Sequence, residues 1–100
     1  MDYICNKYRY LYSLRRSRVR FDILVALAKI YPNYLPPSEI SRVTGHYQSD
    51  ILGALIGNTK YSKENSLVEI GLVEVIVDKN KRYYKATQLG LDCLKTINEI

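Results

Sequence analysis

One stretch of the chain, PPSEISRVTGHYQSDILGALIG over residues 36–57, restricts the fold more than any other. Its first half suits a helix from Pro37 onward and places Ile40 and Val43 at helical spacing before Gly45. Its second half carries another apolar pattern and ends in a glycine, a residue type that often ends helices. We therefore predict two short helices that meet at a tight corner made by Gly45, with Ile40 and Val43 buried.

The second helix of this pair is predicted over residues 47–57. Ile51, Ala54 and Leu55 are expected to face inward, because they recur at helical spacing. Small Ser41 stands where the two helices must approach each other. Together these features predict a helix-turn-helix motif.

Other patterns surround the pair. Residues 14–31 place apolar side chains at helical spacing until a proline stops the run, which predicts a first helix. Residues 34–35 leave room only for a very short strand, and residues 59–66 are polar and basic, as in a loop. The N-terminal residues 1–13 fit either a strand or a helix, and we favour the helix.

The last third of the chain predicts a hairpin followed by a helix. β-branched and aromatic residues form two runs, 72–77 and 82–86, separated by a charged turn. Thr87 suits the N-cap of a final helix over residues 88–99.

Composition limits the size and the partners of the chain. With 100 residues, 47% of them hydrophobic, we expect a single domain over residues 1–100, with residues 1–13 as an N-terminal extension and 88–100 as a C-terminal helix. Fifteen Lys and Arg against ten Asp and Glu give a net charge of +5, which favours polyanionic partners. We expect no membrane span and no secretory signal, hence a cytoplasmic location.

The residues that usually perform chemistry are scattered. The cysteines, Cys5 and Cys93, lie far apart without a CxxC motif, so we interpret them as reduced packing residues. We expect no metal site and no cofactor, no small-molecule ligand is evident, and no motif indicates an enzyme.

The order of these elements resembles the winged helix-turn-helix transcriptional regulators, particularly the small one-domain forms common in archaea. The resemblance spans residues 17–94 and depends on SEISRVTG, SDILGAL, SLVEIGLVEV and KRYYKATQLG in this order. It implies an α+β, mainly α, fold with a three-helix core, a β-hairpin wing and an extra terminal helix. One departure is the insert at residues 56–67, which is either a phosphate-binding extension or a spacer.

The same resemblance implies that double-stranded DNA is the partner and that the protein is nucleoid-associated. The recognition helix, residues 47–57, would then lie in the major groove, and the wing, residues 77–83, on the DNA backbone. Glutamine and serine can bond base edges, and a glycine lets the backbone come close to the duplex. The predicted base-reading residues are Tyr47, Gln48, Ser49 and Gly53.

Basic residues are the candidates for phosphate contacts. The arginine cluster at residues 15–20 lies at the predicted start of the first helix, the unfavourable end for cations, which indicates an external anion. For any one of these residues, a solvated surface position is the alternative. The predicted phosphate contacts are Arg15, Arg16, Arg18, His46, Lys60, Lys63, Lys79, Lys81 and Arg82.

A homodimer would let two recognition helices read two half-sites. Apolar residues at both ends of the chain are candidates for its interface, although either stripe is also able to cap the chain's own core. Two alternatives to a regulator are a winged-helix protein-interaction module and a non-specific chromatin protein. The predicted interface residues are Tyr8, Leu11, Tyr12, Leu91, Leu94 and Ile97.

Overall fold

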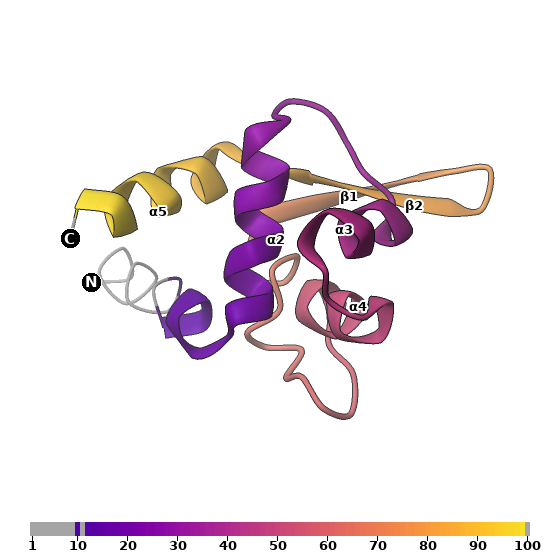
Figure 1. Ribbon diagram of the computed structural model, residues 1–100, viewed down its shortest axis with the longest axis horizontal. Coiled ribbons are helices and arrows are strands. Elements are labelled where there is room, and N and C mark those ends of the chain that lie inside the picture. The colour runs from indigo at the N-terminus through magenta and orange to yellow at the C-terminus, as the bar shows by residue number, and fades with distance from the viewer. Residues whose placement is uncertain (1–9, 11, 100) are drawn as a thin grey trace.

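The computed structural model describes residues 10 and 12–99, with the side chains of residues 98 and 99 left out. Tyr8 and Leu11, two predicted interface residues, and most of the N-terminal extension therefore lie outside the described residues. The elements are α2 (Arg18–Lys29), α3 (Pro37–Thr44), α4 (Gln48–Ile56), β1 (Val73–Asp78), β2 (Lys81–Ala86) and α5 (Gln88–Glu99) (Figure 1).

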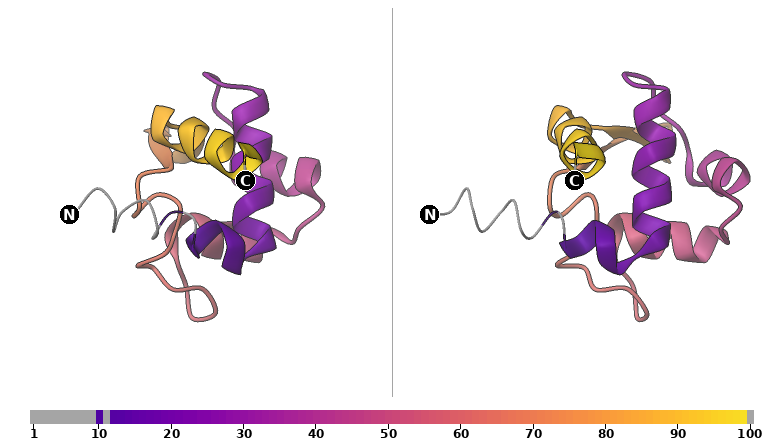
Figure 2. Two further views of the ribbon diagram at one scale, coloured as in Figure 1. Left: turned by 90° about the vertical axis from the view of Figure 1, so that its left-hand side faces the viewer. Right: turned by 60° about the vertical axis from the view of Figure 1, so that its left-hand side comes forward.

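Helix α2 is the central element of the molecule. Helices α3 and α4 lie on one side of it and α5 on the other, as the turned views also show (Figure 2). Its fully buried residues Ile23, Leu24 and Leu27 form the core together with apolar residues of the other elements. Burying one such side chain stabilises the fold by about 1.5–3 kcal/mol, so this packing sets the position of α3 and α4.

The predicted burial of the helix pair holds except at one position. Ile40 of α3 and Ile51, Ala54 and Leu55 of α4 are fully buried. Val43 was expected inside, but 54% of it is exposed. The reason is the shortness of α3, in which Ile40 alone fills the core position, while Val43 lies at the edge of a groove between α2 and α3.

The predicted first helix is interrupted at Ser17. This residue is extended, with φ −140° and ψ 112°, and its hydroxyl accepts a hydrogen bond from the Arg20 backbone N–H, so it caps α2. A separate helical segment, residues 12–16, precedes it. Arg15 and Arg16 therefore lie at the C-terminal end of that segment, where cations are favourable. The expectation that they stand at a helix start is wrong.

Gly45 makes the corner of the helix-turn-helix, as predicted. Its φ of 81° lies in the left-handed region, which glycine adopts without strain. The Ser41 hydroxyl donates a hydrogen bond of 2.6 Å to the His46 carbonyl, and the Thr44 hydroxyl donates one of 2.7 Å to the Ile40 carbonyl. These bonds fix the path from α3 into α4.

The hairpin forms from antiparallel β1 and β2, with Val73 opposite Ala86 and Asp78 opposite Lys81. Lys79 and Asn80 both have positive φ, 50° and 67°, as in the two-residue turns that fit the twist of a hairpin. The predicted hairpin is confirmed.

The base of the hairpin is attached to the helices. Leu35, in the predicted very short strand, exchanges two backbone hydrogen bonds with Tyr84, of 2.9 and 2.8 Å. At the end of β2, the Thr87 hydroxyl accepts a hydrogen bond of 3.1 Å from the Gly90 N–H, which confirms Thr87 as the N-cap of α5. No helix in the described part of the chain is long and apolar enough to cross a bilayer.

The insert at residues 56–67 folds back onto the helices. The Leu67 and Val68 N–H groups donate hydrogen bonds of 3.0 Å to the carbonyls of Ala54 and Leu55 at the end of α4. The Ser13 hydroxyl donates a bond of 2.7 Å to the Asn65 carbonyl. The loop is therefore attached at several points to the rest of the fold.

Candidate nucleic-acid interface

The start of α4 is the exposed part of that helix. Tyr47 is 82% exposed, and Gln48 and Ser49 are also exposed. Tyr47 is the N-cap residue and makes no side-chain capping hydrogen bond to the N–H groups of the first turn. Three of the four predicted base-reading residues thus stand together at one accessible helix end.

Gly53, the fourth predicted base-reading residue, faces the protein and not the solvent. It is buried, and a β-carbon built on it would collide with the ring of Tyr61 and stand 2.6 Å from Nδ2 of Asn58. The close approach that Gly53 allows is therefore that of the insert loop. The prediction that it faces a duplex is wrong.

His46, a predicted phosphate contact, has an internal partner instead. Its Nε2 lies 2.8 Å from Oδ2 of Asp22 in α2, and the other carboxylate oxygen of Asp22 lies 3.1 Å from Nε of Arg18. The His46 side chain is half-buried, and it links the turn before α4 to α2. The structure thus replaces the predicted phosphate contact with a positioning contact for α4.

The hairpin supplies a second, separate group of exposed basic residues. It extends far beyond the helices, with its turn at the free end (Figure 1). Lys79, Lys81 and Arg82 are exposed there, as expected for a wing tip. Ile76 and Val77, which belong to the β-branched run that predicted the first strand, are exposed on the projecting hairpin.

The basic residues of the insert are placed differently from one another. Lys60 Nζ lies 3.3 Å from Oδ1 of Asp50, and the Tyr61 hydroxyl donates a 3.1 Å hydrogen bond to the same oxygen. Burial and this hydrogen bond raise the pKa of Tyr61. Lys63 is exposed next to Gly57 at the end of α4. The insert therefore extends the surface of α4, and its role as phosphate contact or spacer stays a prediction.

The arginine cluster separates into exposed and buried members. Arg15, Arg16 and Arg18 are exposed. Arg20 belongs to the predicted cluster but not to the predicted phosphate contacts, and it is only 6% exposed. The sequence contains a signal for its burial, because Arg20 precedes Ile23 and Leu27 at helical spacing on the buried face of α2.

The predicted dimer residues that the structure describes also differ in exposure. Tyr12 is exposed, while Leu91 and Ile97 are half-buried against the core. Leu94 is 9% exposed and belongs to the core itself. The alternative reading, a stripe that caps the chain's own core, therefore holds for Leu94, while an interface role of the others stays a prediction.

The described residues contain no group of three or more His, Cys, Asp or Glu side chains able to hold a metal ion. Cys93 is buried against the core, and burial, assisted by Asp92, raises the pKa of its thiol to about 11. This agrees with the packing role expected of Cys93.

The helix-turn-helix around α2, completed by the β1–β2 hairpin and by α5, defines a mainly helical α+β protein with the winged helix-turn-helix fold. The chain belongs to the EarA-like family, which its residues 10–97 match.

Two comparisons extend this assignment. The chain is 38% identical over 88 residues to MJ0905, an uncharacterized protein of Methanocaldococcus jannaschii, covering 87% of this chain and 79% of that protein. The structure of this chain resembles the homodimeric winged helix-turn-helix DNA-binding domain of Mb0332 from Mycobacterium bovis, with a TM-score of 0.68. That likeness covers 98% of this chain and 79% of the other at 18% identity, so it concerns the fold alone.

Proposed function

We propose that this protein is a transcriptional regulator that binds double-stranded DNA as a homodimer, with α4 in the major groove and the wing on the DNA backbone. The observation that carries the proposal is the accessible start of α4, where Tyr47, Gln48 and Ser49 are exposed while the opposite face of the helix is in the core. A helix held in this way presents base-reading side chains at a fixed orientation.

The chemistry of the two exposed surfaces supports different roles. Glutamine bonds the edge of adenine with two hydrogen bonds, so Gln48 is the strongest candidate for base readout. Lys79, Lys81 and Arg82 at the wing tip are exposed cations, which neutralise phosphates without reading sequence. The net charge of +5 supports the same polyanionic partner.

The homodimer is supported by two arguments. The structural neighbour Mb0332 is described as homodimeric. One winged-helix unit contacts few base pairs, and two units on a two-fold operator increase the specificity. Tyr12, Leu91 and Ile97 are the described residues that we assign to this contact, because each keeps part of its surface exposed.

A DNA titration over a range of salt concentrations tests the function. For a DNA binder, the logarithm of the affinity falls with that of the salt concentration by about 0.9 for each phosphate contact. Genomic fragments that contain an operator should compete better than random duplex of the same length. Equal competition by all fragments would support the alternative of a non-specific chromatin protein. The absence of salt-sensitive binding would exclude DNA as the partner.

One observation favours the protein-interaction module as a second candidate. A groove of about 450 Å³ between α2 and α3 is lined largely by apolar side chains, among them Phe21, Val25 and Ile30, and exposed Val43 borders it. Apolar side chains on a surface often mark contacts with other proteins. If the protein is such a module, charged substitutions in the groove should abolish its function. The unmodified protein should then show no affinity for DNA.

A further inference from the structure

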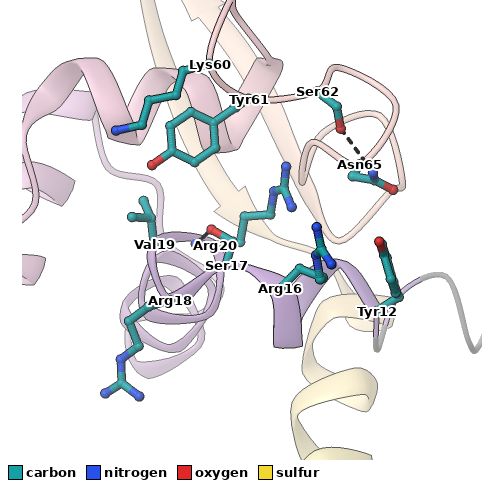
Figure 3. A pocket seen from close by; sticks show the side chains of 10 residues that line it. All are labelled: Tyr12, Arg16, Ser17, Arg18, Val19, Arg20, Lys60, Tyr61, Ser62 and Asn65. Atoms are coloured by element: carbon teal, nitrogen blue, oxygen red, sulfur yellow. Dashed lines mark hydrogen bonds between the residues drawn. The ribbon is translucent and has the colours of Figure 1, made fainter.

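A pocket of about 460 Å³ lies between the N-terminal end of α2 and the loop that follows α4 (Figure 3). We call it the basic pocket. Four cationic residues line it, and no Asp or Glu is among its described lining residues. The cations are Arg16, Arg18, Arg20 and Lys60.

Arg20 is the unusual member of this set. It is 6% exposed, and its Nε has no hydrogen-bond partner in the described part of the protein. Its side chain extends from α2 toward the loop that carries Tyr61, Ser62 and Asn65, and the Arg16 side chain also points toward this loop (Figure 3). A buried guanidinium without an acceptor is strongly unfavourable, and buried polar groups in native proteins normally have partners.

The two carboxylates that pair with Lys60 and Arg18 each have a second partner. Asp50 accepts from Lys60 and from the Tyr61 hydroxyl. Asp22 is paired with Arg18 and with His46. Arg20 forms no ion pair with a described residue, and its described neighbour is the ring of Tyr61, whose centroid lies 5.9 Å from the guanidinium carbon. Among the described residues, no carboxylate therefore pairs with this buried guanidinium, and its Nε has no acceptor.

Two further features increase the positive potential of the basic pocket. It adjoins the start of α2, a 12-residue helix with no acidic residue in its first turn, and a helix N-terminus is positively polarised. Arg16 lies over the Tyr12 ring, with 5.3 Å from the guanidinium carbon to the ring centroid, at the opposite side of the pocket lining from Lys60. Guanidinium groups are the donors best suited to phosphate oxygens.

We propose that the basic pocket binds one phosphoryl group, with Arg20 as its buried donor and Arg16 as a second donor. The phosphoryl group comes either from the backbone of a bound nucleic acid or from a soluble phosphate compound, since both present the same anionic oxygens. The site is separate from the start of α4 and from the wing, and it does not depend on the proposed base readout.

The test compares Arg20→Met with Lys29→Met. Methionine keeps much of the apolar stem of Arg20 and removes the donors, while Lys29, exposed at the other end of α2, provides the same loss of charge outside the pocket. Inorganic phosphate is titrated against chloride at equal ionic strength. Binding is measured from the melting temperature and from the ³¹P line width. Wild type and Lys29→Met should bind phosphate with the same affinity. Arg20→Met should bind it more weakly, by about ten-fold or more.

A second arm identifies the source of the phosphoryl group. If it belongs to the nucleic-acid backbone, Arg20→Met should reduce the salt slope of duplex binding by about 0.9 relative to Lys29→Met, and phosphate should compete with the duplex. If it belongs to a soluble compound, Arg20→Met should lose phosphate binding and keep the duplex affinity and slope. Either result supports the site.

The proposal is overturned if Arg20→Met equals Lys29→Met both in phosphate binding and in the salt slope. A protein that binds no duplex but loses phosphate binding in Arg20→Met would retain the site and contradict the proposed function, so the two failures are distinguishable. Should Arg20→Met not fold, Arg20→Lys replaces it in the phosphate titration. Lysine keeps the charge but not the Nε donor, so we then expect weakened but measurable phosphate binding.

Discussion

The ring of Tyr61 occupies the space in which a β-carbon of Gly53 would stand. The ring is fixed in this position because its hydroxyl donates a hydrogen bond to Asp50, on the same side of α4. The absence of a side chain at Gly53 thus allows the insert to lie directly on the helix. Because Asp50 is engaged there, the side of α4 left open to a partner is the one that begins with Gln48 and Ser49.

Gly53→Ala should therefore destabilise the protein. In an exposed helix this substitution stabilises by about 1 kcal/mol, because glycine is a poor helix former. Here the new methyl group overpacks against the anchored ring, and we expect a net loss of about 1–2 kcal/mol in the free energy of unfolding. Urea denaturation measures it. In a Tyr61→Ala background the same change should become neutral or stabilising, and an equal loss in both backgrounds would contradict the contact.

The wing residues should contribute affinity without specificity. Replacing Lys79, Lys81 and Arg82 by Ala should weaken binding to all duplexes alike and reduce the salt slope by about 0.9 for each true phosphate contact. Binding titrations at several salt concentrations measure both quantities. Arg42→Ala is the matched control, because Arg42 is already paired with Glu39 at 2.6 Å. Unchanged affinity and slope in the triple variant would exclude the wing.

Gln48 should read a base. Gln48→Ala should cost about 1–3 kcal/mol at one base pair and relax the preference there, while binding to random duplex remains intact. Selection of binding sites from a random library measures this preference. Ser38, exposed at the start of α3, is the control position, and Ser38→Ala should leave the selected sequence unchanged. The same site selected at the same stringency by Gln48→Ala would contradict groove readout by α4.

The last helix allows folding and pairing to be separated. Leu94→Ala should lower the free energy of unfolding by about 2–5 kcal/mol, because the side chain is buried in the core. Ile97→Glu should leave a folded chain, since Ile97 is half-buried and shares an apolar hollow with Arg15 and Arg18. If α5 forms the dimer, sedimentation at tens of micromolar should show wild type as a dimer and Ile97→Glu as a monomer. A monomeric wild type would contradict the homodimer.

Cys93 should be unreactive in the native protein. With a thiol pKa of about 11, the thiolate fraction at pH 8 is about 0.1%, far below that of an ordinary exposed cysteine. Because the folded-state pKa is raised, the contribution of this group to stability is present below its ordinary pKa of 9.0 and is lost as the pH rises toward about 11. Labelling by a disulfide reagent in a Cys5→Ser background should be slow, and fast after addition of denaturant. Equal rates would contradict burial.

Local signals in the sequence predicted most of the elements. The final helix, the hairpin and the Gly45 corner agree with the structure, since each has a local signal in capping, β-branching or backbone conformation. Periodicity did not show the break at Ser17, because apolar spacing continues on both sides of a cap that depends on one hydroxyl.

The errors at the candidate site have a common physical cause. Gly53 and His46 were assigned to the solvent-facing side of a helix-turn-helix, but their surroundings are formed by residues distant in sequence. Tyr61 covers the first, and Asp22 binds the second. No local pattern in the sequence indicates such long-range contacts, whereas the exposed positions Tyr47, Gln48 and Ser49 depend only on the start of one helix.

The two backbone hydrogen bonds between Leu35 and Tyr84 fix the base of the wing to the helices, while its tip projects away from them (Figure 1). From Glu74 to Arg82, the side chains along the hairpin are all exposed. Its reach is therefore set by strand length alone, at about 3.3 Å for each residue added to a strand. Adding two residues to each strand would move the basic tip outward by about 6–7 Å and keep every side chain on its own face. Within such a scaffold, the spacing between the two contact surfaces can change while the residues that form them stay the same.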